Sequence, residues 1–369
     1  PPLASLEIPE RFAKAMFERR AKLATHEYLI APSKIDLKVA KPEISVVIPV
    51  CNHFAFTASL LLQLAAEYGP DSKRRAQVIV VDNGSTDRTT ELPALFPGVV
   101  YVRTEDPIGY TAACNLGAKE ATAPVIVFVN NDIELGKGAL TAFLDAFAAD
   151  KTVGVLGGKI VLTDGRTQEA GGLVYANGGT AGFGRGMAPE REVLNIARDV
   201  DYVSGCLLAI RASLFKALDG FDELFSPGYF EDTDLCLRAW GAGSRVRYLP
   251  HAYITHYEYG TYSKGRPKEI SFGKMFTNKA KYLRKHRDVL LRTGVPASDR
   301  DQTRGAFRLG GRDQKYVLMI EDLAPDHLFG SGFARSEDVL KEFLDRGWRV
   351  TVMAGSKRPG DATFMERYS

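Results

Sequence analysis

The chain has 369 residues, of which 45% are hydrophobic and 25% are charged. These are the proportions of an ordinary folded globular protein, and they exclude a disordered or collagen-like chain. The 48 Lys and Arg residues against 45 Asp and Glu residues give a net charge of +3, which is too balanced to indicate nucleic-acid binding by itself. At roughly 100–200 residues per domain, the length predicts two or three domains.

The cysteines also narrow the class of protein. Cys51, Cys114, Cys206 and Cys236 are widely spaced and form no CxxC pair, so neither a zinc signature nor a disulfide framework is indicated. We expect reduced thiols in a cytoplasmic protein. No apolar run reaches the roughly 18 residues of a membrane-spanning helix, and no signal peptide opens the sequence. GxxxxGK[ST] and a strand-linked GxGxxG are absent, which argues against ATP-dependent kinases and nicotinamide dehydrogenases.

The first half of the chain alternates strand-like and helix-like segments. Residues 1–40 form an appendage with one predicted amphipathic helix that packs on the main domain. The main domain, 41–292, opens with ISVVIPV, which is typical of a strand buried on both faces. A helix over 55–68, the runs AQVIVV and VVYVRT, a helix over 109–120 and the run APVIVFV follow. This alternation indicates βαβ units, so we expect an α/β fold with a Rossmann-like, mostly parallel sheet flanked by helices.

The second half is less regular. Residues 154–186 are Gly-rich and predict strands and hairpins, and a helix is expected over about 231–240. Residues 264–292 carry ten Lys and Arg with an apolar stripe, which indicates a basic amphipathic helix. Residues 293–313 read as a linker. Residues 314–369 contain one strand–helix–strand step, too small for a core of its own, so we expect the truncated start of a second domain.

Polar residues follow several predicted strands, at the edge where parallel sheets bind ligands. In Asn130-Asn131-Asp132 a carboxylate flanked by amides suits a hard divalent cation that bridges two phosphates, although an Asp after a strand is also a common turn residue. In DNGSTD, residues 82–87, the polar side chains could bind a base edge or a ribose. The alternative is an Asx-turn with a cap on the next helix.

Two further patterns suggest chemistry. Glu231, Asp232 and Asp234 occupy four positions before an apolar helix. One of them could serve as a general base toward a hydroxyl, although acids in a first helical turn also favour the helix dipole. His256 ends a predicted strand, where a lone His is usually structural. Because no H-x-x-x-H pair is present, a hydrolytic zinc centre is not indicated.

Seven motifs in order give a family resemblance. ISVVIPVCN, VIVVDNGSTD, PIGYTAACNLGA, VIVFVNNDIEL, DYVSGCLLAIRASLF, LDGFDELFSPGYFEDTDLCLRAWGAG and RVRYLPHAYITHYEYG span residues 44–262. Together they resemble the family-2 glycosyltransferases with a GT-A fold, in the bacterial branch of rhamnosyl- and galactofuranosyltransferases. The resemblance implies an inverting, metal-dependent hexosyl- or pentosyltransferase of bacterial cell-surface polysaccharide synthesis. It would move a sugar from a UDP- or dTDP-linked donor to a hydroxyl of a glycan or lipid-linked glycan, with Mg²⁺ or Mn²⁺ as cofactor.

The same resemblance assigns roles to residues. It implies that the donor nucleotide lies against Pro49, Val50, Asn52, Asp82, Asn83, Ser85, Gly109, Asn115, Asn130 and Asn131. Asn130-Asn131-Asp132 matches the family's DxD with Asn in the first acidic position, so Asp132 and His256 become the expected metal ligands. Asp232 matches the catalytic base, with Glu231 beside it. The donor sugar or acceptor would lie near Ser204, Gly205, Cys206, Tyr229 and Phe230.

The tail carries a second resemblance. KYVLMIEDLAPDHLFGSGFARSEDVLKEFLDRGWRV is similar to the first strand, loop and helix of GT-B glycosyltransferases, with Gly330 and Gly332 in the loop that faces a donor. This implies that the natural protein is a multi-domain glycosyltransferase.

Other classes of protein stay open. The chain could be a nucleotide-sugar or glycan-binding module without catalysis, although Asp132, Asp232 and His256 argue against it. A nucleotidylyltransferase would need a Gly-rich, basic loop after the first strand, which PVCNHFAFT lacks. A nucleic-acid binder lacks a recognised module. The basic helix of 264–292 could touch anionic lipid at the inner face of the plasma membrane, or it could be a solvated helix packed on the catalytic domain.

Overall fold

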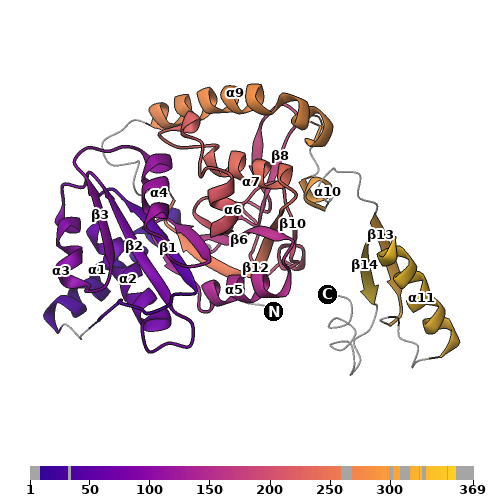
Figure 1. Ribbon diagram of the computed structural model, residues 1–369, viewed down its shortest axis with the longest axis horizontal. Helices are drawn as coiled ribbons and strands as arrows, with labels where there is room; N and C mark the ends of the chain where they lie inside the picture. Colours follow the sequence, from indigo (N-terminus) through magenta and orange to yellow (C-terminus); the bar gives the residue numbers. More distant parts are fainter. Residues whose placement is uncertain are drawn as a thin grey trace. The chain divides into compact units, whose positions relative to one another are not determined.

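The computed structural model describes residues 9–31, 35–258, 268–296, 302–307, 316–323, 330–346 and 348–354, together with residues 298 and 325. The chain divides into two compact units, Pro1–Arg308 and Leu309–Ser369. Figure 1 shows the large sheet of the first unit, and the second unit appears at the yellow end of the colour bar.

The first unit is built on one large sheet with the strand order β10-β12-β6-β11-β4-β1-β2-β3. Six strands on this path point the same way: β1 (Ile44–Val50), β2 (Ala76–Asn83), β3 (Val100–Thr104), β4 (Val125–Val129), β6 (Val153–Leu162) and β12 (Arg245–His256). Strands β10 (Arg198–Asp199) and β11 (Leu207–Arg211) run the other way. The predicted α/β fold with a mostly parallel sheet is therefore confirmed.

Helices cover both faces of this sheet. On one face, Val46 and Ile48 of β1 belong to the apolar cluster with α2 (Phe54–Tyr68) and α5 (Ala139–Ala149). On the other face, Val47 joins the cluster with α4 (Tyr110–Lys119), α6 (Ala212–Ala217) and α7 (Glu231–Gly241). Since successive side chains of a strand point to opposite faces, ISVVIPV needs apolar residues at consecutive positions to fill both clusters.

The structure of the segments outside this sandwich agrees only in part with the predictions made from the sequence. Helix α1 (Glu10–Ile30) packs on α2, with Phe17 and Ala21 against Phe56. Helix α9 (Lys268–Thr293) lies within the predicted basic segment, whose residues 264–267 fall outside the described part of the chain. Part of the predicted linker is ordered: α10 (Gln302–Phe307) packs on β8 (Gly172–Val174). The reason is that Val295 and Ala306 are apolar and find buried positions there.

Short elements complete the first unit. They are η1 (Arg88–Glu91), α3 (Leu92–Leu95), β5 (Ile133–Leu135), β7 (Thr167–Glu169), β9 (Thr180–Gly182), η2 (Glu192–Leu194) and η3 (Glu223–Phe225). Strand β5 pairs with β12, and β7 pairs with β6. These two pairings bring loop residues to the carboxyl edge of the parallel strands.

The second unit contains β13 (Tyr316–Glu321), α11 (Ser331–Asp345) and β14 (Arg349–Ala354). Its two strands are parallel, and Leu340 of α11 packs against both of them. This is the strand–helix–strand step that the sequence predicts, while the likeness to a GT-B domain stays a prediction. Among the described residues of both units, no helix is long and apolar enough to cross a membrane.

Candidate active site

A cavity of about 1260 Å³ opens at the carboxyl ends of β1, β2 and β4. Its lining contains all but three of the residues assigned from the family resemblance: Pro49, Val50, Asn52, Asn83, Gly109, Asn130, Asn131, Asp132, Ser204, Gly205, Cys206, Tyr229, Phe230, Glu231, Asp232 and His256. The three that do not line it are Asp82, Ser85 and Asn115. The fold thus brings together side chains that lie up to nearly 210 positions apart in the sequence.

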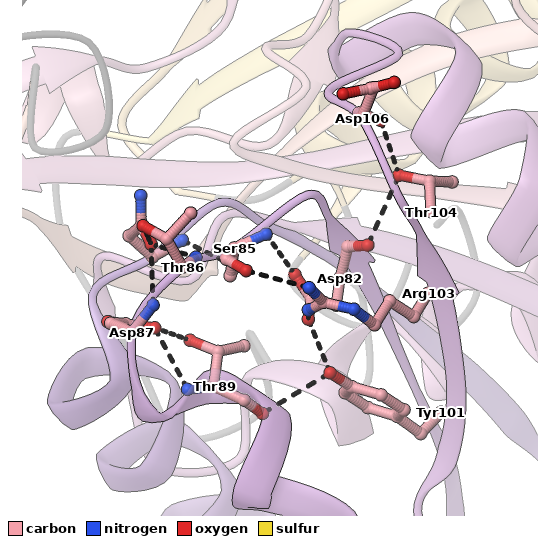
Figure 2. A network of polar contacts seen from close by, with 10 residues as sticks. Asp82, Ser85, Thr86, Asp87, Thr89, Tyr101, Arg103, Thr104 and Asp106 are labelled. Carbon is pink, nitrogen blue, oxygen red and sulfur yellow. Dashed lines mark hydrogen bonds and ion pairs between the residues drawn. The ribbon is translucent and has the colours of Figure 1, made fainter.

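The Asp82 side chain lies inside the wall of the cavity and links the residues that form this wall. Its carboxylate is fully buried, accepts hydrogen bonds from Ser85 N at 2.8 Å and Tyr101 Oη at 2.5 Å, and forms an ion pair with Arg103. Figure 2 shows these partners converging on Asp82. The bond to Ser85 reaches the N–H of the third residue ahead, one residue farther than in the Asx-turn that the sequence left open as the alternative.

Asn52 joins the loops that follow β1 and β2. Its Oδ1 accepts from Thr86 N at 2.8 Å and Asp87 N at 3.2 Å, and its own N–H donates to Ser85 Oγ at 2.7 Å. Asp87 in turn accepts from Phe54 N at 2.9 Å, at the start of α2. The two loops therefore form one hydrogen-bonded wall, and the expected helix cap is observed at Asp87.

Gly109 and Asn115 hold α4 against the loop before α7. Gly109 has φ +92°, and a Cβ there would lie 2.6 Å from Pro227 Cβ, so only glycine fits this position. The Asn115 amide bonds the backbone of Phe221 through both of its ends, at 2.8 and 2.9 Å. Asn115 is thus engaged in packing α4, outside the cavity lining.

One corner of the cavity joins the predicted metal ligands. Antiparallel pairing sets Ile133 of β5 opposite His256 of β12, and this places Asp132 beside the imidazole. Asp132 Oδ1 lies 3.3 Å from His256 Nε2. Asn130 Nδ2 lies 3.4 Å from the same nitrogen. The Asn131 amide points elsewhere, donating to Thr57 Oγ1 at 3.1 Å.

Asp132 and His256 are the two side chains of this corner that could hold a divalent cation, and no group of three or more His, Cys, Asp or Glu side chains suited to a metal ion is found among the described residues. Asp132 Oδ1 is buried and accepts no hydrogen bond from the described residues. Burial opposes ionisation of Asp132, but the charge of His256 lowers the pKa of this carboxyl below its usual value. Burial would likewise lower the pKa of His256, yet Cys206 and Asp132 together raise it. A carboxylate oxygen and an imidazole nitrogen that face each other are ligands that a hard or borderline cation accepts.

A second corner holds the predicted base. Asp232 Oδ2 accepts from Gly205 N at 2.9 Å, and Oδ1 accepts from Thr233 N at 2.6 Å. Burial raises the pKa of Asp232, although these hydrogen bonds favour the charged form. Burial and the Asp232 charge raise the pKa of Glu231 well above its usual value. Glu231 Oε2 is buried without a hydrogen-bond partner among the described residues.

The loop before Asp232 has an unusual backbone that α9 supports. Tyr229 and Phe230 have φ of +74° and +75°, a left-handed conformation that costs energy for such side chains. Asn278 of α9 is buried and donates to the carbonyls of Phe225, Gly228 and Tyr229 at 2.7 to 3.1 Å. The supporting helix therefore fixes where the two aromatic residues and Asp232 meet the cavity.

Helix α9 also closes a buried ionic cluster below the site. Asp234 is fully buried, and its carboxylate lies 2.6 Å from nitrogen atoms of Arg238, Lys285 and His286. Arg238 has a structural role here as an ion-pair partner of Asp234. Some of the basic residues of α9 thus serve the packing of α7.

Sequence reasoning missed several residues of the cavity lining, among them Gln168 and Glu169. Gln168 Oε1 lies 2.8 Å from His256 Nδ1. Glu169 accepts from Tyr202 Oη at 3.3 Å, and burial together with the Asp232 charge raises the pKa of Glu169 to about 8. Both lie in the Gly-rich stretch, where nothing in the local pattern distinguishes them from hairpin residues.

The fold matches that of known proteins. The crystal structure of GalNAc-T7 with UDP, GalNAc and Mn²⁺ aligns with a TM-score of 0.51 at 16% identity, over 66% of this chain and 48% of that chain. The first unit therefore has the GT-A glycosyltransferase fold.

Sequence comparisons then identify the family. Residues 45–218 match the model of glycosyl transferase family 2. The chain is 30% identical over 223 residues to the N-acetylglucosaminyl-diphospho-decaprenol L-rhamnosyltransferase of Mycobacterium tuberculosis, covering 53% of this chain and 70% of that one. It is 26% identical over 261 residues to an O-antigen biosynthesis protein of Myxococcus xanthus, covering 66% of this chain and 20% of that protein. The chain belongs to glycosyl transferase family 2. It spans between 20% and 42% of the length of several other curated relatives.

Proposed function

We propose that the first unit is an inverting glycosyltransferase. It would move a sugar from a UDP- or dTDP-linked donor to a hydroxyl of a glycan or lipid-linked glycan in bacterial cell-surface polysaccharide synthesis. The observation that carries this proposal is one cavity that contains both the Asp132–His256 corner and the partly exposed carboxylate of Asp232. The names of the relatives agree with a polysaccharide product.

Asp232 is the proposed base. Two backbone N–H groups fix its carboxylate, and its raised pKa brings it closer to that of an effective proton acceptor near neutral pH. Asp232 takes the proton of the acceptor hydroxyl as that oxygen forms its bond to the anomeric carbon. The bond from this carbon to the diphosphate breaks on the opposite side, so the configuration inverts. Glu231 is less suited, because burial and the Asp232 charge raise its pKa well above the usual value and so oppose its ionised form.

The remaining residues bind and orient. Asp132 and His256 would hold Mg²⁺ or Mn²⁺, which when bound neutralises the charge of the departing diphosphate. The wall of Asn52 and Asn83 would bind the nucleotide, with Asp82 and Ser85 stiffening it from behind. Tyr229 and Phe230, held from α9, would stack on a sugar face, and the Ser204-Gly205-Cys206 loop borders the same space.

Calorimetric titration tests this function. UDP, dTDP and GDP are each titrated with and without Mn²⁺ into the wild type, Asp132→Ala and Asp145→Ala. Asp145, whose side chain is 59% exposed, is the matched control. We expect one nucleotide to bind in a metal-dependent manner to the wild type and to Asp145→Ala, and Asp132→Ala to lose this binding. No nucleotide binding under any of these conditions would overturn the proposal.

A second variant separates an enzyme from a binding module without catalysis. Asp232→Asn removes the proton acceptor but keeps the shape and one carbonyl oxygen of the side chain. It should bind the nucleotide like the wild type and lose at least 100-fold in release of nucleoside diphosphate from the donor, in line with the roughly 10²–10⁴-fold worth of general base catalysis. No release by the wild type would support the binding-module alternative, and equal release by the two proteins would exclude Asp232 as the base.

We also propose that the outer face of α9 contacts an anionic membrane that carries the acceptor. Phe276 and Leu291 of this helix are 65% and 64% exposed, and Arg284 and Arg287 are exposed on the two sides of the kink at His286. Exposed apolar side chains interleaved with basic ones suit an interfacial helix on anionic lipid. Lys274 and Met275 of the same helix line the cavity, which would bring the membrane surface near the site.

Vesicle sedimentation tests this contact. Vesicles of phosphatidylglycerol and phosphatidylcholine are compared with pure phosphatidylcholine at low and high salt. We expect binding to the anionic vesicles at low salt, and its loss in Phe276→Ala/Leu291→Ala and in Arg284→Glu/Arg287→Glu. Phe12→Ala, on the exposed side of α1 at 58% exposure, is the control. No binding by the wild type, or equal binding by all variants, contradicts the contact.

A further inference from the structure

Gln168 lies directly behind the imidazole of the predicted metal ligand. It sits in β7, which pairs with β6, and β6 pairs in turn with β12 up to His256. Gln168 Oε1 is 2.8 Å from His256 Nδ1, on the side of the ring away from Asp132. The imidazole is therefore held at both nitrogen atoms by different partners.

The chemistry of the amide oxygen decides which nitrogen carries hydrogen. A carbonyl oxygen only accepts hydrogen bonds, so Nδ1 must be the donor to Gln168. Nε2 then faces Asp132 Oδ1 at 3.3 Å, and this oxygen accepts no hydrogen bond from the described residues. In the neutral Nδ1–H form, the lone pair of Nε2 faces Asp132 Oδ1, so a cation between the two atoms would contact both of them. When no cation is bound, a second proton on Nε2 takes that place, which agrees with the raised pKa of His256.

We propose that Gln168 is a positioning residue that fixes the Nδ1–H form of His256 and so presents Nε2 to a divalent cation. This inference rests on the proposed metal-dependent function. Histidine ligands generally donate their second ring N–H to a neighbouring acceptor, which sets the tautomer and the ring orientation. Gln168 does this with a neutral amide, so it adds no second negative charge beside Asp132.

The opposite orientation of the amide makes a different prediction. If Gln168 donated its NH₂ group to Nδ1, Nε2 would carry the hydrogen, and Nε2 would donate to Asp132 in place of binding a cation. Glutamate at position 168 can accept but, when ionised, not donate. Gln168→Glu therefore stabilises the Nδ1–H form of His256 and destabilises the Nε2–H form, whereas Gln168→Leu stabilises neither form.

The experiment measures Mn²⁺ affinity in the presence of UDP, from the electron paramagnetic resonance signal of free Mn²⁺. We expect Gln168→Leu to bind Mn²⁺ roughly 10- to 100-fold more weakly than the wild type, and Gln168→Glu to bind at least as tightly as the wild type. Gln63→Leu is the control, because it also loses one amide-oxygen acceptor, from Leu135 N at 2.8 Å, away from the imidazole. Thermal unfolding shows whether each variant is folded.

The outcomes separate the inference from the function on which it rests. If the wild type binds Mn²⁺ and Gln168→Leu binds equally well, the inference is overturned and the proposed function stands. If Gln168→Glu is as weak as Gln168→Leu, the assigned tautomer is wrong. If the wild type binds no Mn²⁺, both fail together. Long-range ¹⁵N–¹H spectra with diamagnetic Mg²⁺ and UDP give an independent check, in which hydrogen on Nε2 of His256 would contradict the proposal.

Discussion

Glu169 offers a sharp test of the electrostatics of the cavity. It is a buried carboxyl group at 9% exposure, with Tyr202 Oη donating to it at 3.3 Å. Burial and the nearby charge of Asp232 raise the pKa of Glu169 to about 8 from an ordinary value of 4.5. Glu169→Gln replaces it with a neutral group of nearly the same shape, so the variant removes the titration and little else.

The sign and size of the effect follow from proton linkage. Between pH 4.5 and about 8 the folded protein keeps a proton on Glu169 that the unfolded chain has lost. The free energy of unfolding therefore falls as the pH rises, because the folded state binds more protons. The stabilisation of the folded state by the proton on Glu169 is fully present below pH 4.5 and is lost as the pH rises through 8. At about 1.4 kcal/mol per pH unit, the whole interval amounts to roughly 5 kcal/mol.

Urea unfolding of the wild type and Glu169→Gln between pH 5 and 9 measures this pH-dependent contribution of Glu169 to the free energy of unfolding. We expect the variant to gain stability relative to the wild type by about 1.4 kcal/mol per pH unit up to pH 8, with a plateau above it. Glu91→Gln, at a surface carboxylate, is the control and should show no such growth in this range. Parallel stability curves for Glu169→Gln and the wild type would refute the reasoning, because they would mean that Glu169 titrates normally.

Three further substitutions test the supports of the site. Asp234→Ala leaves Arg238, Lys285 and His286 without the fully buried carboxylate that they contact, so urea unfolding should show a loss of about 3 kcal/mol or more in the free energy of unfolding. Gly109→Ala forces a side chain to φ +92° and to 2.6 Å from Pro227 Cβ, and should lower the melting temperature by several degrees, about 2 kcal/mol of stability. Arg103→Met removes the ion pair of buried Asp82, and should weaken nucleotide binding in calorimetry and cost about 2 kcal/mol in urea.

The fold was largely predictable because its strands are buried on both faces. ISVVIPV and VIVFV are continuous apolar runs, and such runs fit few places other than the middle of a sheet covered by helices. The position of the cavity follows from the same fact, since the parallel strands β1, β2 and β4 end at one edge. Asn130 to Asp132 follow β4 directly, so their place at that edge could be inferred from chain order alone.

Gln168 and Glu169 could not be found in this way. They reach the cavity because β7 pairs with β6 in a register that contains a bulge, Ile160 opposite Glu169 and Val161 opposite Thr167. A shift of one residue would turn both side chains to the other face. Nothing in TDGRTQEAGG specifies that register, which depends on partners elsewhere in the chain.

Asp82 and Asn115 differ from the prediction in another way. Both are expected to contact the donor nucleotide, but their side chains bond other parts of the protein. Sequence order places Asp82 at the end of β2, but its side chain turns to Arg103 on the neighbouring strand β3 and to Tyr101. Asn115 turns to the backbone of Phe221, far ahead in the chain. Periodicity identifies where a residue lies, not which partner takes its polar atoms.

Buried polar atoms without a hydrogen-bond partner indicate more about function than the positions of polar residues do. Most polar side chains of the cavity wall bond one another, as buried polar groups must. Among the described residues, the buried carboxylate oxygens without a hydrogen-bond partner are Asp132 Oδ1 and Glu231 Oε2, and both residues line the cavity. Leaving such atoms unpaired costs stability, and at these two places a bound group would compensate for that cost. One marks the corner with His256 and the other adjoins Asp232, which are the two places where the proposed transfer needs a cation and a base.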